Sequence, residues 1–142
     1  MTFAPDGPEP VGAERPTSRV FKTTEIIFSS DDGTTLFGKL TTPTGGKRHP
    51  VVIWVQTAEA QTVDTRVLIA DGKVIEYFDL YRECLATMNV AFFSYEGRGV
   101  RSGSQAPRYV DIDRPIFDSS TLEHKVRDAV GAVDAIRRQA SI

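Results

Sequence analysis

The chain has 142 residues, of which 40% are apolar and 25% are charged, and these fractions fit one globular domain. The formal net charge is −2 with both signs mixed along the chain, so no basic surface favours nucleic acid or an anionic membrane as a partner. A single cysteine, the lack of a secretory signal and the lack of an apolar run of about 20 residues together predict a cytoplasmic protein.

The first 18 residues differ in composition from the rest of the chain. Residues 1–18 contain four prolines and few large apolar side chains. Such a segment buries too little apolar surface to offset the entropy lost on ordering, so it is predicted to be a disordered tail. Residues 19–142 are predicted to form the domain.

A β-hairpin is expected at the start of this domain. Residues 20–28 and 34–40 are rich in β-branched and aromatic side chains, and the dipeptide Asp32-Gly33 lies between them. Because both turn residues tolerate positive φ, this pattern predicts two antiparallel strands joined by a tight turn.

The middle of the chain predicts a buried strand and then a helix. Residues 51–55 form a short apolar run, typical of a strand covered on both faces, and residues 56–74 are polar and irregular. Apolar residues at helical spacing predict a helix over 75–88, which Asn89 ends in the left-handed conformation. These apolar residues are Tyr77, Tyr81, Cys84, Leu85 and Met88.

A second buried strand is predicted at 90–95, then a long glycine- and proline-containing loop, and then a helix over 119–138. Asp118, Ser119 or Ser120 is expected to cap that helix. A strand–helix–strand order with apolar strands implies parallel pairing, so the predicted class is α/β: an antiparallel hairpin leading into a parallel sheet with flanking helices. The last helix has one apolar stripe, formed by Leu122, Val126, Ala129, Val130, Val133 and Ile136.

The segment after the second buried strand carries the most information. Tyr95-Glu96-Gly97-Arg98-Gly99-Val100-Arg101-Ser102-Gly103 resembles the Tyr-Asp-x-Arg-Gly-x-Gly-x-Ser segment that follows the fourth strand of many α/β-hydrolases. Residues 30–38, 49–55 and 128–136 are similar to the hairpin, the third strand and the helix before the nucleophile in that superfamily, which includes esterases and serine aminopeptidases. The resemblance covers about residues 20–138.

The resemblance implies a strand order in which 90–95 lies between the hairpin and 51–55. It also implies hydrolysis of ester, thioester or peptide bonds by the complete fold. The nucleophile of such enzymes lies in a Gly-x-Ser-x-Gly elbow, and no such pentapeptide occurs in this chain. We therefore expect residues 19–142 to be a partial α/β-hydrolase domain, truncated before the nucleophile, inactive alone and without a catalytic residue of its own.

The sequence departs from the family in two places. Gln56-Thr57-Ala58-Glu59-Ala60 stands where the family often has His-Gly, in the loop that donates a backbone N–H to the oxyanion hole. Thr57 and Ala58 are the candidate oxyanion residues, and an ordinary strand-to-helix loop is the alternative. In the glycine turn, Arg101 stands near the place of the usual second glycine, which shortens the turn by one residue.

Nothing in the sequence predicts a cofactor or a metal site. The dinucleotide fingerprint needs a helix directly at its glycines, but the helix predicted after Gly97 and Gly99 begins some fifteen residues later. His49 and His124 are both predicted to lie at the surface without a catalytic role.

Two functional hypotheses therefore remain. The chain is either part of a hydrolase, or a non-enzymatic interaction module that binds through an exposed strand edge. In both cases strand 51–55 is the expected contact, since it would present an unpaired apolar edge. The expected partner is either the missing C-terminal half of the fold or a second copy of the chain.

Overall fold

The structure is a computed structural model that describes residues 21–46, 48–56, 60–106 and 108–142. The predicted tail at 1–18 lies outside the described residues, so its prediction stays open.

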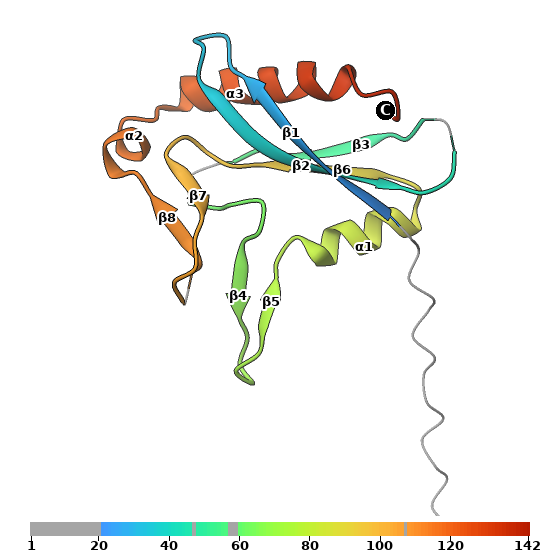
Figure 1. The fold of residues 1–142 in the computed structure, drawn as a ribbon, viewed down its shortest axis with the longest axis horizontal. Coiled ribbons are helices and arrows are strands. Elements are labelled where there is room, and N and C mark those ends of the chain that lie inside the picture. Colours follow the sequence, from blue (N-terminus) through green and yellow to red (C-terminus); the bar gives the residue numbers. More distant parts are fainter. Residues whose placement is uncertain (1–20, 47, 57–59, 107) are drawn as a thin grey trace, which may run out of the picture.

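A four-stranded mixed sheet forms the centre of the fold, in the order β1-β2-β6-β3 (Figure 1). The first two strands are an antiparallel hairpin, with Gly33 in the turn at a φ of 84°. β6 pairs antiparallel with β2 and parallel with β3. The predicted hairpin, the two later strands and the strand order are confirmed. Of those two strands only β6 is buried, since no residue of β3 is buried and Val52 is exposed. The strands are β1 (Phe21–Ser29), β2 (Thr35–Pro43), β3 (Val51–Trp54) and β6 (Ala91–Tyr95).

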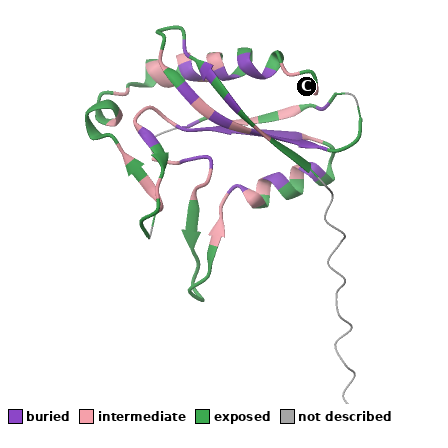
Figure 2. Ribbon diagram, in the orientation of Figure 1, coloured by how far each residue is buried: buried purple, intermediate pink, exposed green. Residues whose placement is uncertain are grey.

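Helices cover both faces of this sheet (Figure 1). α1 (Asp79–Thr87) lies on one face and α3 (Leu122–Arg137) on the other. Because side chains alternate along a strand, Phe93 of β6 packs in the α3 layer while Phe92 packs against Phe78 just before α1. Figure 2 shows the buried residues concentrated along β6 and the neighbouring β2.

Three predictions about the connecting segments are wrong. Residues 56–74 are not all irregular, because β4 (Arg66–Leu68) pairs with β5 (Val74–Glu76), so that α1 begins only at Asp79. The loop after β6 also contains structure. It holds the hairpin of β7 (Val100–Ser102) and β8 (Val110–Ile112) and the short helix α2 (Arg114–Asp118). Strands of three residues are too short to show a periodic pattern in sequence.

The last helix begins at Leu122 rather than 119, and its cap is Thr121 instead of the three residues predicted. The Thr121 hydroxyl accepts from the backbone N–H of His124, whose ring in turn accepts from the backbone N–H of Thr121. The helix faces β1 through small residues. A Cβ on Gly131 would come within 2.9 Å of the Ser29 carbonyl oxygen, so glycine permits this close approach.

An arginine whose side chain is only 8% exposed joins three segments of the fold. Arg98, in the turn after β6, donates from Nη2 to Asp128 Oδ1 of α3 at 2.6 Å, and from Nη1 to Asp32 Oδ2 of the hairpin turn at 2.6 Å. Ser30 lies 3.3 Å from the same guanidinium. The hydrogen bond from Arg98 holds the pKa of the Asp32 carboxyl well below its ordinary range. Arg98 therefore holds the turn after β6, the hairpin turn and α3 in place relative to one another.

Replacing Arg98 by methionine should lower the free energy of unfolding by about 3 kcal/mol, because Asp128 would remain buried without its countercharge. Urea unfolding followed by circular dichroism measures this change. Arg127→Met is the matched control. Its partners Glu123 and Asp31 are exposed, so a much smaller loss is expected. Equal losses in the two variants would show that Arg98 is not a structural centre.

Candidate functional site

The carboxyl ends of β3 and β6 meet at one edge of the sheet because these strands are parallel. In open α/β sheets ligands bind outside this edge. Four polar side chains gather there, and we call them the carboxyl-edge cluster: Lys39, Asp64, Glu96 and Ser102.

Ser102 lies between the two carboxyl groups of the cluster. Its Oγ is 3.1 Å from Glu96 Oε1 and 3.4 Å from Asp64 Oδ2, and its backbone N–H also donates to Glu96 Oε1 at 3.1 Å. Lys39 Nζ donates to both oxygens of Asp64, at 2.7 and 2.8 Å. Since one hydroxyl carries one proton, Ser102 donates to one carboxyl group at a time.

Burial raises the pKa of Glu96 above its ordinary value of 4.5. The hydrogen bonds from Ser102 and the charge of Lys39 act against this shift, whereas the charge of Asp64 adds to it. Glu96 is therefore a carboxyl group that keeps its proton to a higher pH than a solvent-exposed glutamate. Such a group can store or exchange a proton at the carboxyl edge.

Next to the cluster, Gln56 links the ends of the two parallel strands. Its Nε2 donates to the Tyr95 carbonyl oxygen at 2.7 Å. Gln56 Oε1 is buried and bonds to no described residue, and the Tyr95 hydroxyl is buried close to the Gln56 backbone N–H. Both residues line a cavity of about 280 Å³ between the sheet and α3. Burial raises the pKa of Tyr95 to about 12, so its hydroxyl stays neutral.

The candidate oxyanion residues Thr57 and Ala58 lie outside the described residues. They follow Gln56 directly in sequence, and their role stays a prediction.

The surface prediction for His49 is wrong. This residue is only 4% exposed, and its Nδ1 lies 3.3 Å from the Asn89 carbonyl oxygen. Asn89 adopts a φ of 61°, as predicted for the end of α1, and its turn brings that carbonyl to the amino end of β3. His49 is therefore at the opposite end of β3 from the carboxyl-edge cluster. His124 is partly exposed and caps α3, so neither histidine approaches Ser102 among the described residues.

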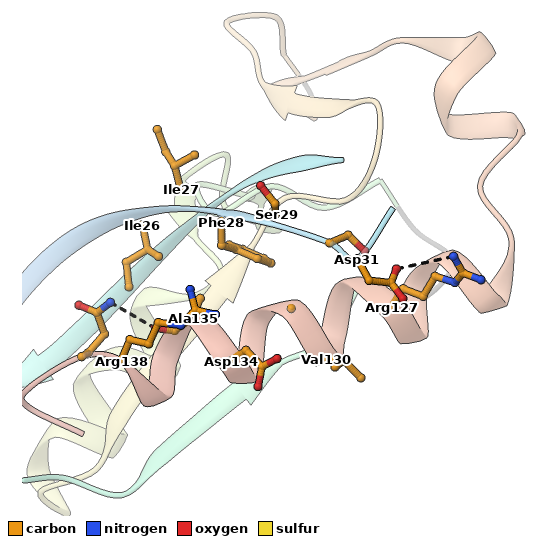
Figure 3. Close-up of a pocket in the computed structure, with 13 residues that line it drawn as sticks. Ile26, Ile27, Phe28, Ser29, Asp31, Arg127, Val130, Asp134, Ala135 and Arg138 are labelled. Atoms are coloured by element: carbon orange, nitrogen blue, oxygen red, sulfur yellow. Dashed lines mark hydrogen bonds and ion pairs between the residues drawn. The ribbon is translucent and has the colours of Figure 1, made fainter. Parts of the chain in front are cut away.

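A second cavity, of about 490 Å³, lies between β1 and α3 (Figure 3). It is lined by Ile26 to Asp31 on one side and by α3 residues such as Val130 and Arg138 on the other. Its Arg127 is paired with Glu123 at 2.6 Å and with Asp31 at 3.6 Å. The carboxyl-edge cluster lies where ligands bind in open α/β sheets, and we therefore place the candidate site there rather than in this cavity.

Sequence reasoning pointed to the glycine-turn motif that contains Glu96 and Ser102, but it missed Lys39 and Asp64. These two residues are 25 positions apart, and only the placement of the 60–65 loop beside β2 joins them. In the sheet, Lys39 lies directly opposite Ser94 and on the same face. The alternation of side chains along the strand is the one signal in the sequence that indicates this face for Lys39.

In the described part of the chain, no group of three His, Cys, Asp or Glu residues is placed to hold a metal ion. No described helix is long and apolar enough to cross a membrane.

Comparison with known proteins supports the fold and leaves the function open. No family model and no curated protein matches this chain. The structure is similar to that of hypothetical protein PA2218 from Pseudomonas aeruginosa, with a TM-score of 0.54 and 20% identity. The match covers 90% of this chain but only 34% of the length of that protein. At this identity the likeness concerns the fold alone, a mixed sheet with flanking helices.

The hydrogen-bond pattern predicts how the pKa of Glu96 responds to its neighbours. Ser102→Ala should raise that pKa further, because a hydrogen bond to the carboxylate is lost, and Asp64→Asn should lower it, because a repelling charge is removed. Carbon-13 NMR titration of the Glu96 carboxyl measures both shifts. Asp71→Asn, in the exposed turn between β4 and β5, is the control and should change nothing. Shifts of opposite sign, or a wild-type pKa at or below 4.5, would contradict this picture.

The same shift predicts a pH dependence of stability. Because the pKa of Glu96 is raised in the folded state, its protonated form contributes to the free energy of unfolding. This contribution is complete below pH 4.5 and is lost as the pH rises through the raised pKa. The free energy of unfolding of the wild type should therefore fall relative to that of Glu96→Gln over this rise in pH. A difference that stays constant with pH would contradict the shift.

Proposed function

We propose that this chain forms the N-terminal segment of an α/β-hydrolase-type domain that hydrolyses ester, thioester or peptide bonds. In this proposal the nucleophile comes from polypeptide that adds a further strand to the sheet at β3. The observation that carries the proposal is the strand order β1-β2-β6-β3, with β3 parallel to β6 and with its other edge open within the described residues.

The side of the molecule next to this open edge is apolar. Val55, just after β3, and the α3 residues Val126 and Val130 are 43%, 56% and 57% exposed. With Leu122 and Val133 they line a groove of about 620 Å³. Part of the apolar stripe of α3 is therefore exposed. A strand paired with β3 and a helix following it would cover this groove.

The polar groups at the carboxyl edge support the same arrangement. Gln56 Oε1 lies just after the end of β3 and bonds to no described residue, and the buried Tyr95 hydroxyl lies close to the Gln56 backbone. Gln56 also lines the apolar groove. A strand-to-helix turn entering from that side would bring backbone N–H and C=O groups to these two buried side chains.

No Gly-x-Ser-x-Gly pentapeptide occurs in residues 1–142, so the isolated chain should not react with a fluorophosphonate probe. Fusion to the polypeptide encoded after the Ile142 codon should produce stoichiometric labelling of one serine in the added part. Labelled peptides identified by mass spectrometry give the measurement. Stoichiometric labelling of the isolated chain would contradict the proposal. The Ser102→Ala variant is the control, because it shows whether any labelling comes from Ser102, the hydroxyl that bonds to Glu96 at this edge.

The second candidate is an interaction module that binds another copy of the chain. The same apolar groove favours it, since an open strand beside exposed valines is a surface for strand pairing. Sedimentation velocity should then show a dimer that Val130→Lys dissociates into monomers. Leu80→Lys, which alters a 61% exposed leucine on α1, should leave that dimer intact. A monodisperse monomer at all concentrations would exclude the module.

A further inference from the structure

The hairpins β4–β5 and β7–β8 lie side by side and enclose a cleft of about 550 Å³. We call it the hairpin cleft. Residues from both hairpins, from the loop after β3 and from α2 line it. Its volume is within the range of about 300–1,000 Å³ that is usual for small-molecule sites.

The charge of the hairpin cleft is one-sided. Arg66, Arg108 and Arg114 line it, and no Asp or Glu is among the described residues that do so. Arg66 and Arg114 approach the carboxylates of Glu76 and Asp118 only to 3.8 and 3.7 Å, too far for a hydrogen bond. Arg108 forms no ion pair with any described residue. The donor groups of three guanidinium ions therefore remain available to a ligand.

Two of the side chains in the hairpin cleft are held in place. The Arg66 guanidinium lies over the ring of Tyr109, 5.1 Å from its centroid, which orients it. Gln61 Oε1 accepts from the Trp54 indole N–H at 3.1 Å. This bond fixes the orientation of the Gln61 amide, whose two N–H groups can donate to a ligand.

The rest of the lining is largely apolar. It includes the half-buried Val110, Ile112, Phe117 and Tyr77 and the exposed Val67. A fully hydrated inorganic anion would leave these side chains without a partner. A ligand that matches both parts carries an oxyanion group and a short apolar chain.

We propose that the hairpin cleft binds an organic anion, with its carboxylate or phosphate on Arg66, Arg108 and Arg114 and its apolar part on the wall formed by β4, β8 and α2. Ala60 in its lining is the last residue of the candidate oxyanion loop, and Gln61 follows it directly in sequence. In the proposed hydrolase, the hairpin cleft would therefore hold the anionic end of the substrate, and this assignment rests on the proposed function. The binding itself does not depend on it.

Binding to the isolated chain is measured by titration of ¹⁵N-labelled protein with octanoate, octyl phosphate, octanol and inorganic phosphate at constant ionic strength. Octanoate or octyl phosphate should give saturable shifts confined to β4, β8, α2 and their flanking loops, and the tighter of the two identifies the head group. Octanol and inorganic phosphate should bind at least about tenfold more weakly, because each lacks one of the two matched parts.

Replacing Arg66, Arg108 and Arg114 by glutamine together should weaken octanoate binding by more than about tenfold. Arg138→Gln, at the far end of α3, is the single-charge control and should bind as the wild type does. All three cleft arginines are exposed, and an unchanged thermal midpoint shows that the variants fold.

Non-saturable shifts, equal binding of octanol and octanoate, or unchanged affinity in the triple variant would overturn the proposal. None of these results depends on a nucleophile. Failure of the cleft and failure of the hydrolase proposal are therefore distinguishable, since fluorophosphonate labelling reports only the second.

Discussion

The pairing of β6 between β2 and β3 is the constraint on which the rest of the structure depends. All five residues of β6 are buried, and they alternate between the two helical layers. Phe93 and Tyr95 pack in the α3 layer, and Phe92 stacks on Tyr81 of α1 with ring centroids 6.0 Å apart. The chain directly after this strand places Glu96 in the carboxyl-edge cluster and Arg98 in ion pairs with the buried Asp128 and the exposed Asp32. One strand therefore positions both layers and the candidate site.

Placing β6 inside the sheet leaves β3 at its edge, and three features that seem separate then have one cause. The outer edge of β3 is open within the described residues, the valines of α3 beside it are exposed, and Gln56 and Tyr95 present buried polar atoms at its end. Each of these is a group that a further strand, turn and helix would cover or bond. These groups support the proposed function, because buried polar atoms without partners and contiguous exposed apolar surface are both costly in water.

Much of the central sheet follows from the sequence, because its signals are local. Asp32-Gly33 marks the hairpin, continuous apolar runs mark β3 and β6, and Asn89 marks the end of α1. The order of the strands came from the resemblance of the segment around Arg98 to α/β-hydrolases rather than from periodicity. The small hairpins were not predicted because a strand of three residues shows no periodic pattern, and the start of α1 was placed too early as a result. The burial of His49 and the Lys39–Asp64 ion pair were not predicted for a different reason. Their environments are made by segments distant in sequence, which no local rule contains.

Hydrogen exchange of the backbone amides in the monomeric chain tests the open edge of β3 most directly. In a parallel ladder the N–H groups of one strand point alternately to its two sides, so only alternate residues of β3 can donate to β6. The β6 amides should exchange slowest of all, and alternate amides of Val51–Trp54 should exchange rapidly. These rapid amides should become slow when polypeptide that pairs with β3 is bound. Uniform protection of every β3 amide in the monomer, equal to that of β6, would contradict an open edge at β3.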